Sequence, residues 1–183
     1  MEDLVNLAKL LNQRNKIDSQ ISNLIGRPAM AGHLGEFIAS KIFEISLMKS
    51  ASYKGFDGHF TAETLAGRSV NIKLYSEQQG ILDIPPDESI DFFLVLTGPK
   101  SKSMSSRGQA RPFCIESVFL FDARVLVAEL RRAGVKIGIA TSVKKQWWEN
   151  AEIYPIQRNR EFVLAEKQQD LLGLFGSKHM LSQ

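Results

Sequence analysis

The sequence predicts an α/β or α+β protein with one central mixed β-sheet flanked by helices. Two apolar stripes at helical spacing fill most of the first 47 residues. Strand-like segments follow between residues 53 and 97, and a further strand and helices come after residue 112. This order fits one sheet covered by helices, an order that many folds share.

Two helices are expected at the start of the chain. Gly26 and Pro28 mark the end of the first. The second should cover residues 31–47, with Glu36 near its start beside a broad apolar face. The apolar residues of the first helix are Leu4, Leu7, Leu10, Leu11, Ile17, Ile21, Leu24 and Ile25.

Three strands are expected next. Residues 56–60 form a short strand with Asp57 at its edge, and residues 65–68 form a turn. Residues 69–75 alternate apolar and other side chains, so Asn71, Lys73 and Tyr75 share one face of that strand. The unbroken apolar run over 90–97 is typical of a central strand.

The second half of the chain begins with a Ser- and Gly-rich segment that predicts a flexible basic loop. Asp122 is a suitable N-cap for the helix that follows, and Gly134 ends that helix. The expected elements are the loop over 98–111, strands over 112–121 and 135–141, and helices over 123–133 and 165–175.

The chain is expected to be one domain over residues 1–183. Within it we distinguish an N-terminal helix (1–27), a core (31–97), the basic loop (98–111) and C-terminal strands and helices (112–183). No internal repeat or boundary between domains is apparent.

Composition restricts the class of protein. The net charge of +3 permits phosphate binding without requiring it. The single cysteine, Cys114, excludes an internal disulfide framework and is expected to be a small buried residue. No signal peptide or apolar stretch of about 20 residues occurs, so a cytoplasmic protein without a membrane partner is expected.

Three short motifs carry the chemistry. Glu36 lies in Gly-His-Leu-Gly-Glu on the second helix, Asp57 lies in Gly-Phe-Asp-Gly, and Asn71-Ile72-Lys73 lies on the strand over 69–75. In this order they resemble the PD-(D/E)xK nuclease superfamily over about residues 32–96. Polar residues at the ends of ordinary strands are the competing interpretation.

The resemblance implies a restriction endonuclease-like fold and Mg²⁺-dependent cleavage of DNA. It implies that Glu36, Asp57, Asn71 and the main-chain carbonyl of Ile72 hold the metal. It gives Lys73 the catalytic role of orienting water or stabilising the transition state, so the catalytic set is Glu36, Asp57, Asn71 and Lys73. The separation of Asp57 from Lys73 suits a β-hairpin.

Asn71 departs from the motif, which has an acidic residue there. An amide oxygen can bind Mg²⁺ but brings no negative charge. Either the site tolerates the change, or another carboxylate such as Glu77 or Glu63 substitutes, or the fold binds nucleic acid without cutting it.

The basic loop offers a nucleic-acid contact. Lys100, Lys102, Arg107 and Arg111 can each neutralise a phosphate. A solvated loop kept soluble by its charge is the equally weighted alternative. DNA is the expected partner, and RNA is not excluded.

Isolated residues receive simpler interpretations. Arg27 is expected to cap the first helix, with phosphate contact as the alternative. His33 is expected to make a hydrogen bond at the start of the second helix rather than bind zinc, and His59 to be a surface histidine. Of Trp147 and Trp148, one ring is expected in the core and the other at the surface.

The sequence thus predicts a metal-dependent nuclease-like protein, in a restriction or defence context by resemblance alone. The alternative is an inactive nuclease-fold binding module or a subunit of a larger complex. A homodimer through the first helix is also expected. Phosphate loops of ATPases and dehydrogenases, the serine hydrolase elbow and His-Glu-x-x-His do not occur.

Overall fold

The computed structural model describes residues 1–48, 55–85, 89–101 and 112–180, without the side chain of Glu63. It shows the expected mixed α/β fold. The helices are α1 (Glu2–Ile25), α2 (Ala31–Ile42), α3 (Ala123–Arg132), α4 (Lys145–Ala151), α5 (Glu166–Gly173) and α6 (Ser177–Met180), with a 3₁₀ turn, η1 (Glu63–Leu65).

A six-stranded mixed sheet runs through the protein in the order β1-β2-β3-β5-β6-β8. β3 and β5 are parallel, and the other neighbours are antiparallel. β4 and β7 form a separate pair. The strands are β1 (Ile45–Leu47), β2 (Gly58–Phe60), β3 (Ser69–Tyr75), β4 (Ile81–Leu82), β5 (Phe92–Thr97), β6 (Ser117–Asp122), β7 (Thr141–Ser142) and β8 (Glu152–Tyr154).

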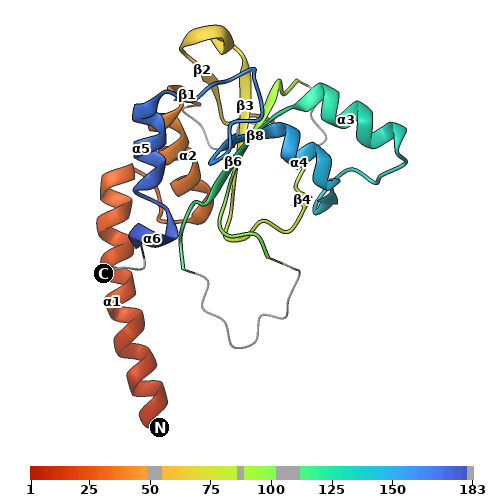
Figure 1. The fold of residues 1–183 in the computed structure, drawn as a ribbon. Coiled ribbons are helices and arrows are strands. Elements are labelled where there is room, and N and C mark those ends of the chain that lie inside the picture. The colour runs from red at the N-terminus through yellow and green to blue at the C-terminus, as the bar shows by residue number, and fades with distance from the viewer. Residues whose placement is uncertain (49–54, 86–88, 102–111, 181–183) are drawn as a thin grey trace.

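Helices cover the two faces of the sheet separately. Figure 1 shows α2 and α5 on one side of the sheet and α3 and α4 on the other. Residues of α2 and α5 pack with Val70 and Leu94 in one buried cluster. Residues of α3 and α4 pack with Phe93 and Val95 in a second cluster. Neighbouring residues of one strand therefore enter different clusters, as the pleat of a strand requires.

The two central strands match the sequence prediction closely. β3 has the expected bounds, and every residue of β5 is buried, as its unbroken apolar run predicted. Asp122 caps α3 through a 2.8 Å bond from the N–H of Val125. α1 also ends at the predicted place. Gly26 follows its last residue and adopts the left-handed conformation that favours glycine and ends a helix.

The prediction for the second helix was too long. α2 ends at Ile42, and Glu44 takes a positive φ of 52° before β1 begins at Ile45. Apolar residues continue through this junction, so periodicity alone did not reveal the change from helix to strand. The consequence is an additional edge strand that pairs with β2.

Two strand predictions in the second half were partly wrong. Residues 112–116 lie outside β6, although the Ile115 N–H donates to the Phe175 carbonyl. The expected strand over 135–141 is reduced to Thr141 at the start of β7. Val135 and Ile137 before it pack against the second cluster without joining a sheet, whereas Ile139 is exposed. None of the described helices is both long enough and apolar enough to span a membrane.

Gly98 lets the chain pass close to the end of β3. A Cβ atom at this position would lie 2.0 Å from the carbonyl oxygen of Ser76. Gly98→Ala is therefore expected to lower the free energy of unfolding by about 1–3 kcal/mol, because the backbone must shift. Urea unfolding measures this loss.

The control for Gly98→Ala is Gly173→Ala, where a Cβ would meet nothing within 4 Å. Gly173 belongs to α5, so alanine there is expected to be neutral or to stabilise by up to about 1 kcal/mol. Equal unfolding free energies for the two variants would contradict the steric argument.

Candidate functional site

Asp57 lies directly before β2, because the strand predicted over 56–60 begins only at Gly58, and it completes the hydrogen bonding of β3. Its N–H donates to the Val70 carbonyl over 2.8 Å. Beyond this point its carboxylate accepts the N–H of Ile72 over 2.6 Å. A side-chain oxygen thus takes the place of a strand carbonyl, and the Asp57 carboxylate is held at the edge of β3.

The main chain of Ile72 faces this carboxylate. In a strand, the N–H and C=O groups of one residue point toward the same neighbour. Since the Ile72 N–H reaches Asp57, its carbonyl points to the same edge of β3 and away from β5. The Asp57 carboxylate and the Ile72 carbonyl, which the resemblance assigned as metal ligands, therefore lie on one side of β3.

Glu36 approaches the same edge from α2. A Cβ on Gly35 would lie 2.8 Å from the Cβ of Leu74, so α2 packs very closely on β3 at this turn. The next residue, Glu36, is near enough to Asp57 that the charge of Asp57 raises the pKa of Glu36, after the larger effect of burial. The structure therefore brings together these two predicted carboxylates.

Arg27 is part of this group, contrary to the prediction that it caps α1. Its guanidinium pairs with the Glu36 carboxylate and donates to the Met48 carbonyl over 3.2 Å. Glu36 and Arg27 are mostly buried, with side chains 18% and 26% exposed. Such a pair is weakly screened by solvent. The site thus contains a cation that the sequence motifs did not indicate.

Burial controls the ionisation of both carboxyl groups. It raises the pKa of Glu36, and the charge of Asp57 raises it further, while Arg27 and His33 oppose the change. Burial also raises the pKa of Asp57, opposed by the bond from the Ile72 N–H and by the charges of Lys73 and Arg27. A cation bound beside two such carboxylates would stabilise their ionised forms.

Asn71 has a structural role that an acidic residue could not fill. Its side-chain amide donates to the Gly55 carbonyl over 3.0 Å, which ties β3 to the segment before Asp57. A carboxylate has no hydrogen to donate there. The Oδ1 atom of Asn71 is buried and has no hydrogen-bond partner among the described residues.

Lys73 and Tyr75 follow Asn71 on the same face of β3, as the alternation predicted. Lys73 is half-buried, and its charge lowers the pKa of Asp57. The Tyr75 hydroxyl accepts the N–H of Asp83 over 2.9 Å, and burial raises the pKa of Tyr75 to about 12. Tyr75 therefore remains protonated, and its hydroxyl holds the main chain at Asp83.

Glu77, one of the two predicted substitute carboxylates, does not complete this group. Glu77 accepts hydrogen bonds from Gln79 and Ser101, both over distances below 3.0 Å, beyond the end of β3. The side chain of Glu63 lies outside the described residues.

His33 Nδ1 bonds with the Pro28 carbonyl at 2.9 Å, as expected of a residue at the start of a helix. His59 packs on the ring of Phe56.

Most of the residues predicted to contact nucleic acid lie outside the described residues. Lys100 is exposed, whereas Lys102, Arg107 and Arg111 lie outside the described residues. The tryptophan prediction is confirmed for Trp148, which is buried between Phe119 and Phe121, whereas Trp147 is half-buried against the same cluster. Cys114 is buried and free, as predicted.

The oxygen groups fit a hard divalent cation. Mg²⁺ is commonly bound through one or two carboxylates, with waters and substrate phosphates completing its shell. Asp57 and Glu36 supply two carboxylates, and the Oδ1 of Asn71 on β3, which has no hydrogen-bond partner among the described residues, is a neutral oxygen. The described residues contain no group of three or more His, Cys, Asp or Glu side chains placed to hold a metal.

The raised pKa values predict how stability depends on pH. Just above pH 4.5, the ordinary pKa of Glu36, the folded protein binds more protons than the unfolded chain. The free energy of unfolding should therefore fall as pH rises, until Glu36 and Asp57 are ionised in the folded state. Glu36→Gln removes one of these groups. It should reduce the loss of unfolding free energy by about 1.4 kcal/mol for each pH unit by which folding raises the pKa of Glu36.

Urea unfolding between pH 4.5 and neutrality measures the effect. The control is Glu166→Gln, because Glu166 is an exposed residue in the first turn of α5. If the wild-type and Glu36→Gln curves ran parallel over this range, the buried carboxyl would not be the source of the pH dependence.

Comparison with known proteins adds no relative to this description. The chain matches no protein-family model and no curated protein sequence. A functional assignment therefore depends on the residues gathered at the edge of β3.

Proposed function

We propose that this protein is a divalent-metal-dependent nuclease of the PD-(D/E)xK type that cleaves DNA phosphodiesters. One observation carries the proposal: the Asp57 carboxylate bonds the Ile72 N–H beside the charge of Lys73, with Glu36 arriving from α2. In chain order, Glu36 belongs to α2, Asp57 directly precedes β2, and Ile72 and Lys73 belong to β3. The sequence motifs that resemble the superfamily follow the same order.

The charges of this group suit phosphate chemistry. Two carboxylates and the Ile72 carbonyl would hold Mg²⁺, which would neutralise phosphate charge and lower the pKa of a bound water. Lys73 supplies a positive charge next to Asp57 that would stabilise negative charge developing on the phosphate. Burial around Asp57 strengthens each of these electrostatic interactions.

A catalytically inactive binding module is the second candidate. Two observations favour it: Asn71 is tied to Gly55 and brings no charge, and Arg27 already neutralises Glu36. Such a protein would keep the fold and bind DNA through basic residues. It would not cut DNA in the presence of metal.

The deciding experiment is cleavage of supercoiled plasmid with Mg²⁺ or Mn²⁺, together with calorimetric titration of each metal. Lys73→Met keeps the apolar stem and removes the charge. It should lower the cleavage rate about 100-fold or more, while metal binding remains because lysine is not a ligand. Lys167→Met, at an exposed position of α5, should cleave as the wild type does.

The possible results separate the two candidates. Metal binding with DNA retardation but no cleavage by the wild type would favour the binding module. Cleavage that both lysine variants retain in full would remove Lys73 from the site. No metal binding and no DNA retardation would exclude both candidates.

A further inference from the structure

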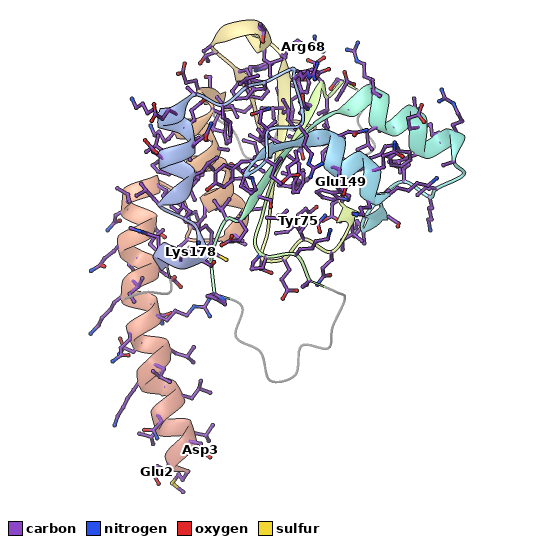
Figure 2. All side chains as sticks on the ribbon, viewed as in Figure 1. Glu2, Asp3, Arg68, Tyr75, Glu149 and Lys178 are labelled. Carbon is purple, nitrogen blue, oxygen red and sulfur yellow. The ribbon has the colours of Figure 1, made fainter. Side chains whose placement is uncertain are left out.

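α1 has an apolar side that the rest of the described chain leaves uncovered. None of its residues is buried. Figure 1 shows it extending far from the body, and Figure 2 places Glu2 and Asp3 at its far tip. The large apolar side chains along this side are 46% to 75% exposed, and they are Leu4, Leu7, Leu10, Leu11, Ile17 and Leu24.

A solitary helix of this kind lacks its usual source of stability. Helices in proteins are stabilised mainly by packing an apolar face against other elements. Among the described residues, those that pack on α1 do so near its C-terminal end, where Ile21 and Ile25 are half-buried and the Ser22 hydroxyl accepts the N–H of Ala29. An exposed apolar patch of this length is typical of a protein interface.

We propose that α1 pairs with α1 of a second copy of this chain. Residues along its apolar side follow alternating steps of three and four, the spacing of helices that wrap around each other. We call this row the seam. The seam consists of Leu7, Leu10, Arg14, Ile17, Ile21 and Leu24, with Leu4 and Leu11 beside it.

The charges of α1 favour a copy of itself over a nucleic acid or an anionic membrane. The helix has three acidic and three basic side chains, so their net charge is zero. Attraction to phosphate or to anionic lipid would require an excess of positive charge. The charged residues are Glu2, Asp3 and Asp18 against Lys9, Arg14 and Lys16.

The area available suffices for a specific pair. A helix of 24 residues approximates a cylinder about 36 Å long and about 11 Å in diameter, and half of its curved surface is roughly 600 Å². Two copies together would bury about 1,200 Å², the lower limit of stable, specific interfaces. Arg14 is the polar residue of the seam, where its partner Asp18 lies 3.4 Å away on the same helix. A single polar residue in such a seam fixes alignment at some cost in affinity.

The pairing predicts the mass of the protein in solution and does not depend on the proposed nuclease activity. Sedimentation equilibrium from about 1 to 100 µM covers the usual affinities of such pairs. The wild type should reach twice the 20.5 kDa mass of one chain. Leu10→Asp/Ile17→Asp, which places two charges in the seam, should remain at the mass of one chain.

The matched control is Asn12→Asp/Ser19→Asp, which adds the same two charges on the opposite side of α1 and should still pair. Arg14→Leu should pair at a concentration about tenfold lower than the wild type, because it removes the polar residue from the seam. Thermal unfolding of each variant checks that the body stays folded.

A wild type at the mass of one chain over the whole range would overturn the proposal. So would a seam variant that still pairs, or an Arg14→Leu variant that pairs no more tightly. Sedimentation of the wild type with anionic vesicles, in place of self-association, would identify a lipid surface as the partner of α1.

Discussion

Asp57→Asn is expected to abolish most metal-dependent cleavage while leaving the protein as stable as the wild type, or more stable. The amide oxygen of asparagine can still accept the N–H of Ile72, so the edge of β3 remains satisfied. The charge needed for metal binding is lost, and cleavage should fall about 100-fold or more. At neutral pH the variant also avoids burying a carboxylate whose pKa is raised by burial.

Asp57→Ala provides the comparison. It removes both the charge and the acceptor of the Ile72 N–H, which costs about 1–3 kcal/mol of unfolding free energy. Plasmid cleavage, calorimetric Mg²⁺ titration and urea unfolding of both variants separate the two roles of Asp57. Full activity in Asp57→Asn would show that this carboxylate is structural only.

Leu94→Ala is expected to cause the largest loss of stability. Leu94 is fully buried in the middle of β5, where it packs in the cluster beneath α2 and α5. Alanine would leave a cavity between layers that cannot close up, at a cost of about 2–5 kcal/mol. Chemical or thermal unfolding measures this cost directly.

Leu174→Ala is the matched control, because Leu174 is 47% exposed near the C-terminal end of α5. Its cost should stay below about 1 kcal/mol. Similar costs for the two leucines would mean that β5 is not the rigid centre of the fold that its burial indicates.

The parts of the fold that the sequence predicted best are those with a strong local pattern. Every residue of β5 is apolar or a buried threonine, and β3 alternates between two differently packed faces. The junction after α2 has no such pattern. There the change from helix to strand depends on the positive φ of Glu44 and on pairing with β2, a contact that local periodicity does not encode.

The candidate site also contains residues that the sequence predicted and residues that it did not. The hairpin spacing was enough to predict that Asp57 and Lys73 come together. Arg27 was missed because its two contacts lie 9 and 21 residues away in the chain, across a helix and a strand. The role of Asn71 also depended on the position of Gly55, 16 residues earlier. A motif specifies which residues can react, whereas these partners follow from packing.

Gly26 lies between a helix that projects from the body and the residue that holds Glu36. α1 ends at this left-handed residue, and Arg27 holds Glu36 immediately after it. A rotation of about 10° at Gly26 would carry the far tip of the helix through roughly 6 Å, because the arm is about 36 Å long. Arg27 lies at the pivot and would hardly move. Ile21 and Ile25 contact the body close to this pivot, so such a rotation would move the exposed part of the helix while the ion pair at the edge of β3 stays in place.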